Sequence, residues 1–300
     1  MTRFHAFWIT RSGRSGTSGD PAARFPFWSV TKTAIAITAL QAVEAGRITL
    51  DAPLPPVDDA APYSLRQLLD HSAGLPDYGP LPAYKSAVAE GQRAWPRATM
   101  LAQALPQGRL FAPGAGWAYS NIGSMLALEA VEGATGQPLA ALITEGITRP
   151  LGLNALRLAE GPGDFADLHW PEARRYDPGW VYHRCLTGTA EAAARLIHGL
   201  FTGQLLEPAT MVEMLRAHPL GGALPGQPWT RCGYSPGLMN GEMGEAGRAI
   251  GHSGAGPFSS NAAYHFPDLP DAPSVAVFAL GPDEGPAELE AARIALSVST

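Results

Sequence analysis

A serine and a lysine three residues apart begin a segment that is almost wholly apolar, and this segment constrains the fold most strongly. Ser29 and Lys32 precede residues 34–45, which are mostly Ala, Ile, Leu and Val, and Gly46 follows. A helix that is apolar on nearly every side is usually buried, and glycine suits a left-handed C-terminal cap. We therefore expect a buried helix with Ser29 and Lys32 on one face of its N-terminal end.

This pair has the chemistry of a nucleophile and a base. Burial lowers the pKa of a lysine, so that its neutral amine can accept the proton of a neighbouring hydroxyl. Backbone N–H groups at the helix N-terminus could face a developing oxyanion. The chain has two lysines, Lys32 and Lys85, beside many arginines, and arginine cannot act as a base. Composition alone could produce a Ser-x-x-Lys, but this sparing use of lysine favours a functional pair.

The composition does not favour several classes of binding partner. The 300 residues carry a formal net charge of -6, which does not favour nucleic acid or an anionic membrane surface. No apolar run reaches the roughly 18 residues that span a bilayer. Residues 1–10 are followed by Arg11 and Arg14 without a small-residue cleavage site, so we expect a cytoplasmic protein without a removable leader. Cys185 and Cys232 suggest neither a disulfide nor a metal site, and we expect no cofactor.

The order of the predicted elements indicates a sheet built from both ends of the chain. Residues 3–28 predict an edge hairpin, with strands at 4–10 and 24–28. Helices are expected at 65–70, 122–132, 190–200, 207–217 and 288–296, with a weakly helical stretch at 84–105 that breaks at Trp95-Pro96. Antiparallel strands are expected at 229–239, 248–252, 260–266 and 274–280. This order predicts a discontinuous sheet domain, residues 1–60 and 205–300, and a mostly helical domain, residues 61–204, with the active site at their interface.

Two further motifs follow Ser29 and Lys32 along the chain. Tyr119-Ser120-Asn121 follows a glycine-rich loop, and His252-Ser253-Gly254 lies on an expected late strand. Together with Ser29-Val30-Thr31-Lys32, they resemble the serine β-lactamase and penicillin-binding protein superfamily. The Tyr-x-Asn form is similar to the class C β-lactamase branch, which includes DD-peptidases, D-aminopeptidases and β-lactamase-like carboxylesterases. The resemblance covers nearly the whole chain and implies an α+β fold of the β-lactamase/transpeptidase type, an antiparallel sheet flanked by helices.

The resemblance implies a role for each matching residue. Ser29 would attack the substrate carbonyl and hold the acyl group, and Lys32 would take its proton. Tyr119 would act as a second base or protonate the leaving group, and which of the two is the first base stays open. Asn121 would orient Lys32. Among residues 252–255, His252, Ser253 and Gly254 match the family's substrate-binding strand, and the backbone N–H of Ala255 would join that of Ser29 in the oxyanion hole.

Departures from the family pattern bear on the substrate. Relatives that bind carboxylates often carry Lys-Thr-Gly, whereas His252 is at most partly charged at neutral pH. We therefore expect a carboxylesterase that acts on a small ester. A D-amino-acid amidase or peptidase, or a weak β-lactamase, is the alternative, and a non-catalytic binding protein is the rival from another class. Oligomeric state stays open. His71 is expected to be a structural hydrogen-bonding residue, and four tryptophans could line an acyl pocket: Trp28, Trp117, Trp180 and Trp229.

Overall fold

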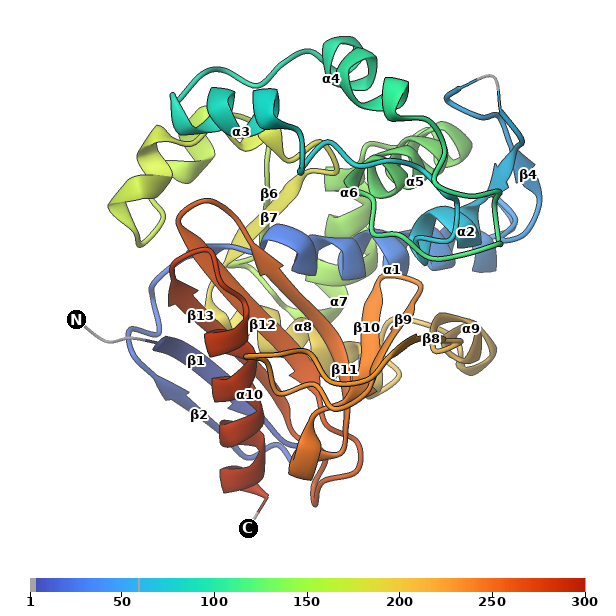
Figure 1. The fold of residues 1–300 in the computed structure, drawn as a ribbon. Coiled ribbons are helices and arrows are strands. Elements are labelled where there is room, and N and C mark those ends of the chain that lie inside the picture. Colours follow the sequence, from blue (N-terminus) through green and yellow to red (C-terminus); the bar gives the residue numbers. More distant parts are fainter. Residues whose placement is uncertain (1–3, 59, 300) are drawn as a thin grey trace.

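Both ends of the chain contribute to one eight-stranded antiparallel sheet (Figure 1). The structure is a computed structural model that describes residues 4–58 and 60–299. The strand order is β2-β1-β13-β12-β11-β10-β9-β8. The strands are β1 Phe4–Ile9, β2 Ser15–Ser18, β8 His218–Gly221, β9 Cys232–Ser235, β10 Leu238–Glu242, β11 Arg248–Ala255, β12 Ser259–His265 and β13 Ser274–Leu280. The predicted fold class is therefore confirmed.

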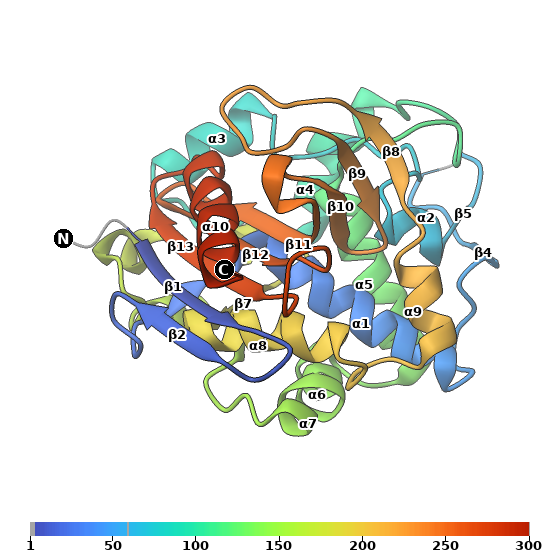
Figure 2. The ribbon, with the colours of Figure 1, turned by 90° about the horizontal axis from the view of Figure 1, so that it is seen from below.

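Helices cover both faces of this sheet because its central strands are apolar on both sides. Along β12, Ala262 and Tyr264 belong to the core under α10 (Gly285–Val298), whereas Ala263 belongs to the opposite core. This alternation follows from the two-residue period of a strand. On the opposite face, α8 (Ala190–Phe201) packs against β1, β12 and β13, as Figure 2 shows from below.

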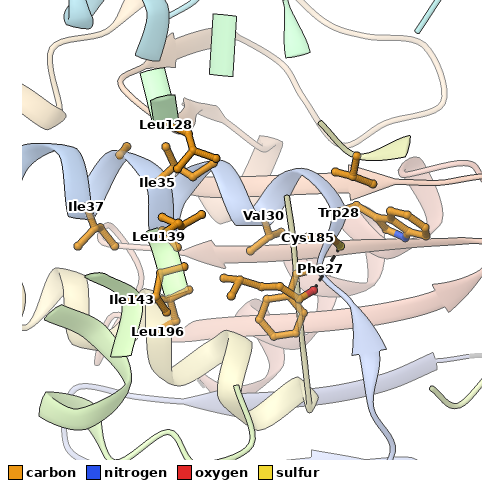
Figure 3. Packing of buried hydrophobic residues seen from close by; sticks show 14 of the residues in the cluster. Phe27, Trp28, Val30, Ile35, Ile37, Leu128, Leu139, Ile143, Cys185 and Leu196 are labelled. Atoms are coloured by element: carbon orange, nitrogen blue, oxygen red, sulfur yellow. Dashed lines mark hydrogen bonds between the residues drawn. The ribbon is translucent and has the colours of Figure 1, made fainter. Parts of the chain in front are cut away.

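The predicted apolar helix is α1 (Thr31–Glu44), and it is buried between the sheet and the helical part of the chain (Figure 1). Figure 3 shows its neighbours: Leu128 of α5, Leu139 and Ile143 of α6, and Leu196 of α8 surround the helix. Each such side chain contributes about 1.5–3 kcal/mol when fully buried. Gly46 has a φ of 66° and closes the helix, as expected.

We call residues 61–204 the helical part of the chain, and it contains most of the remaining helices and most strands of two small sheets. Ser64 and Ser120 cap α2 and α5 with their side chains, Ser64 within a capping box. The helices are α2 Leu65–Leu69, α3 Pro82–Ala89, α4 Arg97–Ala104, α5 Asn121–Thr135, α6 Leu139–Ile143, α7 Arg149–Leu151 and α9 Pro208–Met214. The small sheets contain β4 Pro53–Leu54 with β5 Tyr63–Ser64, and β3 Phe25–Pro26 with β7 Cys185–Gly188 and β6 Arg157–Ala159.

Two predicted strand arrangements are wrong. The partner of β1 in the hairpin is β2, and residues 25–26 instead pair with β7 in the small sheet, because Thr10 N–H bonds to Arg14 O and turns the chain early. The predicted strand 229–239 is divided into β9 and β10 by a turn at Gly237, which has a φ of 69°. A Cβ on Gly237 would lie 2.8 Å from the carbonyl oxygen of Lys32, so the turn packs directly on α1.

The proposed division into two domains stays a prediction. Helix α8 falls within the predicted helical domain, yet it packs on three strands of the main sheet. The predicted absence of a removable leader concerns the N-terminus, and its first residues, Met1–Arg3, lie outside the described residues. Among the residues described, no helix is both long enough and apolar enough to cross a membrane.

Candidate active site

Ser29 lies in a single turn of 3₁₀ helix, Trp28–Val30, that leads directly into α1. Trp28 has a φ of 44°, a conformation that is unusual for a bulky residue. Its indole Nε1 donates to Ser259 Oγ at 3.0 Å, which ties this turn to β12. Strained backbone of this kind is found preferentially at functional sites.

Lys32 lies beneath Ser29 and is 2% exposed. Its Nζ is 3.0 Å from Ser29 Oγ, 2.8 Å from Asn121 Oδ1 and 3.1 Å from His183 Nε2. Burial lowers the pKa of Lys32 from 10.5 to about 7, although Asp77 and Glu284 oppose the change. A substantial fraction of the amine is therefore neutral at pH 7 and able to accept a proton.

Tyr119 approaches the same serine from the other side. Its hydroxyl donates to Ser29 Oγ at 2.7 Å, and Lys32 Nζ lies 4.9 Å from the centre of its ring. Burial raises the pKa of Tyr119 well above 10, although its hydrogen bond to Ser29 opposes this. Tyr119 is therefore a neutral phenol at pH 7, which suits a proton donor better than a base.

Asn121, at the start of α5, is held by a carboxylate that the sequence analysis missed. Asp77 Oδ1 accepts from the Asn121 backbone N–H and Asp77 Oδ2 accepts from Asn121 Nδ2, both at 3.0 Å. The Oδ1 of Asn121 is thereby fixed toward Lys32. Asp77 lies in Leu68-Leu69-Asp70-His71-Ser72-Ala73-Gly74-Leu75-Pro76-Asp77-Tyr78, which is similar to a stretch typical of the class C branch. A signal for Asp77 was therefore present in the sequence.

His183 is the second residue that the sequence analysis missed. It lies three residues after a single turn of 3₁₀ helix, Pro178–Trp180. No motif or local spacing connects it with Lys32, which is 151 positions away. The side chain is buried, and burial together with the charge of Lys32 lowers its pKa well below 6.5. His183 is therefore a neutral imidazole in contact with the lysine.

His252 belongs to a buried row of neutral groups. Its Nε2 lies 2.9 Å from Tyr234 Oη, which in turn lies 3.1 Å from His71 Nε2. His71 Nδ1 accepts from the backbone N–H of Ser120 at 3.3 Å, in keeping with the structural role expected for it. Burial, and secondly the charge of Lys32, lowers the pKa of His252 to about 3. The partly charged His252 that we expected is in fact neutral at pH 7.

The rest of this strand divides between the two faces of the sheet. Ser253 points away from Ser29 and its hydroxyl donates to Met239 Sδ at 3.3 Å. A role for Ser253 in substrate binding stays a prediction. Gly254 faces the nucleophile, and a Cβ there would lie 2.6 Å from Ser29 N. Gly256 N–H bonds to Ser259 O across the hairpin. The next pair, Ala255 with Ser260, is then non-hydrogen-bonded, and Ala255 N–H points away from β12.

A cavity of about 420 Å³ opens beside Ser29. Asn121, His183 and Ala255 line it with the nucleophile, and five aromatic side chains contribute to the rest of its wall: Trp28, Tyr78, Tyr84, Tyr176 and Trp180. Lys85 is the one ionic side chain among the described residues of this wall. Trp117 and Trp229 instead line a second cavity of about 460 Å³, which Tyr119 and Tyr234 also border. The four tryptophans of the sequence prediction are therefore divided between two cavities.

Comparison with known proteins agrees with this geometry. A model of the Beta-lactamase family matches residues 2–298. Esterase EstB of Burkholderia gladioli is 34% identical over 145 residues, which cover 43% of this chain and 37% of that protein. The D-alanyl-D-alanine-carboxypeptidase/endopeptidase AmpH of Escherichia coli K12 is 29% identical over 144 residues, 45% of this chain and 36% of that protein. The matched stretches thus span little more than a third of these relatives.

Solved structures show the same fold over nearly the whole chain. A D-stereospecific amidohydrolase from Streptomyces sp. superposes with a TM-score of 0.81 at 24% identity, covering 99% of this chain and 93% of that one. A D-amino acid amidase from Ochrobactrum anthropi SV3 also gives 0.81, at 18% identity, covering 98% and 95%. At such identities the likeness concerns the fold.

Proposed function

The chain belongs to the β-lactamase family, and on that premise we propose that it is a serine hydrolase that forms an acyl-enzyme on Ser29. One observation carries the proposal: Ser29 Oγ is within hydrogen-bond reach of both Lys32 Nζ, at 3.0 Å, and Tyr119 Oη, at 2.7 Å. A nucleophile, a base and an acid thus meet at one atom. A non-catalytic binding protein has no chemical need for this arrangement.

The reaction begins with a proton transfer. The neutral amine of Lys32 takes the Ser29 proton while Oγ attacks the carbonyl carbon of the substrate. The backbone N–H groups of Ser29 and Ala255 stabilise the resulting oxyanion, and one such donor typically contributes about 3–4 kcal/mol. The Tyr119 hydroxyl then protonates the leaving group, and the Lys32 ammonium returns its proton to the phenolate. Water then attacks the acyl-enzyme in place of the leaving group. The neutral amine of Lys32 takes the water proton, and the Lys32 ammonium returns it to the Ser29 oxygen as the carboxylic acid leaves.

A small carboxylic ester is the substrate that we infer. His252 is neutral where carboxylate-binding relatives carry a cation, so the β-lactam and D-Ala-D-Ala carboxylates lose a partner. The aromatic wall of the 420 Å³ cavity suits an apolar acyl group. Its described lining includes no carboxylate that could bind the ammonium of a D-amino acid. This combination supports a carboxylesterase.

An amide substrate is the second candidate, because structural neighbours include D-amino acid amidases. An acyl-side amide would need Asn121 as a hydrogen-bond partner. However, Asn121 Oδ1 already accepts from Lys32 and one Nδ2 proton goes to Asp77, so a single N–H remains. The site therefore favours the ester. A cytoplasmic location and a small-molecule partner stay predictions.

The test is hydrolysis of p-nitrophenyl butyrate by the wild type, Ser29→Ala and Ser15→Ala, with intact mass after a fluorophosphonate. Ser15 is an exposed serine on β2 and serves as the matched control. We expect turnover and one adduct in the wild type and the control, and neither in Ser29→Ala. Turnover that survives in Ser29→Ala, or a folded wild type without adduct, would refute the acyl-enzyme. A D-phenylalanine amide assayed in parallel separates ester from amide preference.

A further inference from the structure

Lys32 has three hydrogen-bond partners, and one of them has no place in the mechanism above. We propose that His183 is a positioning residue that, together with Asn121, uses both N–H bonds of the neutral Lys32 amine and so directs its lone pair at Ser29. The inference rests on the proposed function, because it assigns a role within the same site. His183 contacts the lysine rather than the substrate carbonyl, and its side chain also helps to line the substrate cavity.

The geometry accounts for both protonation states of Lys32. As an ammonium, Nζ has three protons and three neighbours at 2.8–3.1 Å: Asn121 Oδ1, Ser29 Oγ and His183 Nε2. As an amine it has two protons and one lone pair. Asn121 presents its oxygen, which only accepts, to Lys32, because its Nδ2 is held by Asp77. If His183 Nε2 also accepts, the lone pair is left for the Ser29 hydroxyl.

The surroundings of His183 favour an accepting Nε2. Burial and then Lys32 lower the pKa of His183, with smaller contributions in the same direction from His252 and His71, so the imidazole carries one proton. The Trp28 backbone raises that pKa, as a carbonyl near a ring N–H does. Nε2 lies 3.1 Å from Lys32 Nζ, which as an ammonium can only donate. We therefore assign the imidazole proton to Nδ1, which leaves Nε2 to accept. Nδ1 is buried, and no acceptor lies within hydrogen-bonding distance of it among the described residues.

Loss of His183 should therefore have two separable effects. The ammonium loses one of three acceptors, which disfavours the charged form and lowers the pKa of Lys32 further. The amine also gains rotational freedom, so fewer molecules present the lone pair to Ser29. Misplacement of a reacting group by about 1 Å can reduce the rate about 100-fold. Asp77, Glu284 and Cys185, the other groups that act on Lys32, are unchanged by a substitution at position 183.

The experiment compares His183→Leu with His183→Gln, since Gln keeps an accepting oxygen and Leu does not. Hydrolysis of p-nitrophenyl butyrate is followed from about pH 5 to about pH 10, with circular dichroism to verify folding. We expect His183→Leu to lose roughly 10- to 100-fold in kcat, with little change in KM. The acidic limb of its pH–rate profile should move to lower pH. We expect His183→Gln to recover most of the rate and the position of the limb.

A second readout does not depend on turnover. The chain has two lysines, so carbon-13 labelling of lysine gives one buried signal from Lys32 and one exposed reference from Lys85. We expect the Lys32 titration midpoint to fall in His183→Leu and to stay near the wild-type value in His183→Gln. An unchanged or raised midpoint in a folded His183→Leu overturns the proposal, as does a kcat within about twofold of wild type. A wild type that neither turns over nor labels at Ser29 refutes the proposed function instead, and the titration still decides the role of His183.

Discussion

Replacing Lys32 by methionine should stabilise the protein while it abolishes activity. Lys32 is 2% exposed, and burial lowers its pKa from 10.5 to about 7. Methionine has a similar length and no charge, so it fills the same space without the penalty for desolvating an ammonium. Active sites commonly hold groups that cost stability, and their removal often stabilises the fold.

The magnitude follows from the change in proton affinity. Each tenfold change corresponds to about 1.36 kcal/mol, so the fall from 10.5 to about 7 represents about 4–5 kcal/mol of lost stability at neutral pH. Methionine cannot donate to Ser29 Oγ, Asn121 Oδ1 or His183 Nε2, and each missing bond costs roughly 1 kcal/mol. We therefore expect Lys32→Met to be about 1–3 kcal/mol more stable than the wild type at pH 7.

The dependence on pH gives the sharper test. Between pH 7 and pH 10.5 the unfolded lysine binds a proton that the folded one has released, so wild-type stability rises with pH in that window. The penalty is fully present below pH 7 and disappears above pH 10.5. The advantage of Lys32→Met should therefore shrink by about 2 kcal/mol between pH 7 and pH 9.

Urea unfolding at both pH values measures this difference. Lys85→Met is the matched control, because Lys85 is exposed and forms no ion pair among those of the described residues. Its stability relative to the wild type should not change between the two pH values. If the curves of wild type and Lys32→Met run parallel from pH 7 to pH 9, then Lys32 is not a desolvated amine and the assignment of Lys32 as first base fails.

Three further outcomes test the site. The kcat/KM of ester hydrolysis should rise with pH through a midpoint near 7, because Lys32 must be neutral to act; a profile without this limb would argue for another base. Tyr119→Phe should lose about 10²–10⁴-fold, and more on an amide than on an ester, since an amine needs protonation to leave; equal losses on both substrates would contradict this role. Gly254→Ala places a Cβ 2.6 Å from Ser29 N and should cost about 10²–10³-fold in kcat, whereas Gly133→Ala, with open space around it, should behave as wild type.

Much of the site followed from sequence because its residues lie in motifs. Ser29 and Lys32 are one helical turn apart, and Tyr119 and Asn121 flank the serine that caps α5, so local geometry already orients each pair. The buried helix α1, which begins beside Ser29 and packs against the sheet, was predictable because it lacks a polar face. The structure brings all four side chains into contact, as the order of the motifs indicated.

The remainder depends on contacts between distant positions. His183 reaches Lys32 across 151 residues from an irregular segment, and no local pattern marks such a contact. The pairing of residues 25–26 with β7 is equally distant, whereas the expected hairpin needed only a turn. The orientation of Ser253 was predictable, because a side chain between His252 and Gly254 on a strand must point to the face opposite theirs.

The proposed catalytic pair, Ser29 and Lys32, is held by backbone on one side and oriented by side chains on the other. Gly254 of β11 packs on Ser29 N and the Gly237 turn packs on Lys32 O, so the main sheet fixes the main chain of both residues. The acceptors that orient the Lys32 amine, Asn121 and His183, come from the helical part of the chain. Neither part alone holds the lone pair on the serine. Substitutions that shift the helical part relative to the sheet should therefore reduce kcat even where they touch no catalytic atom.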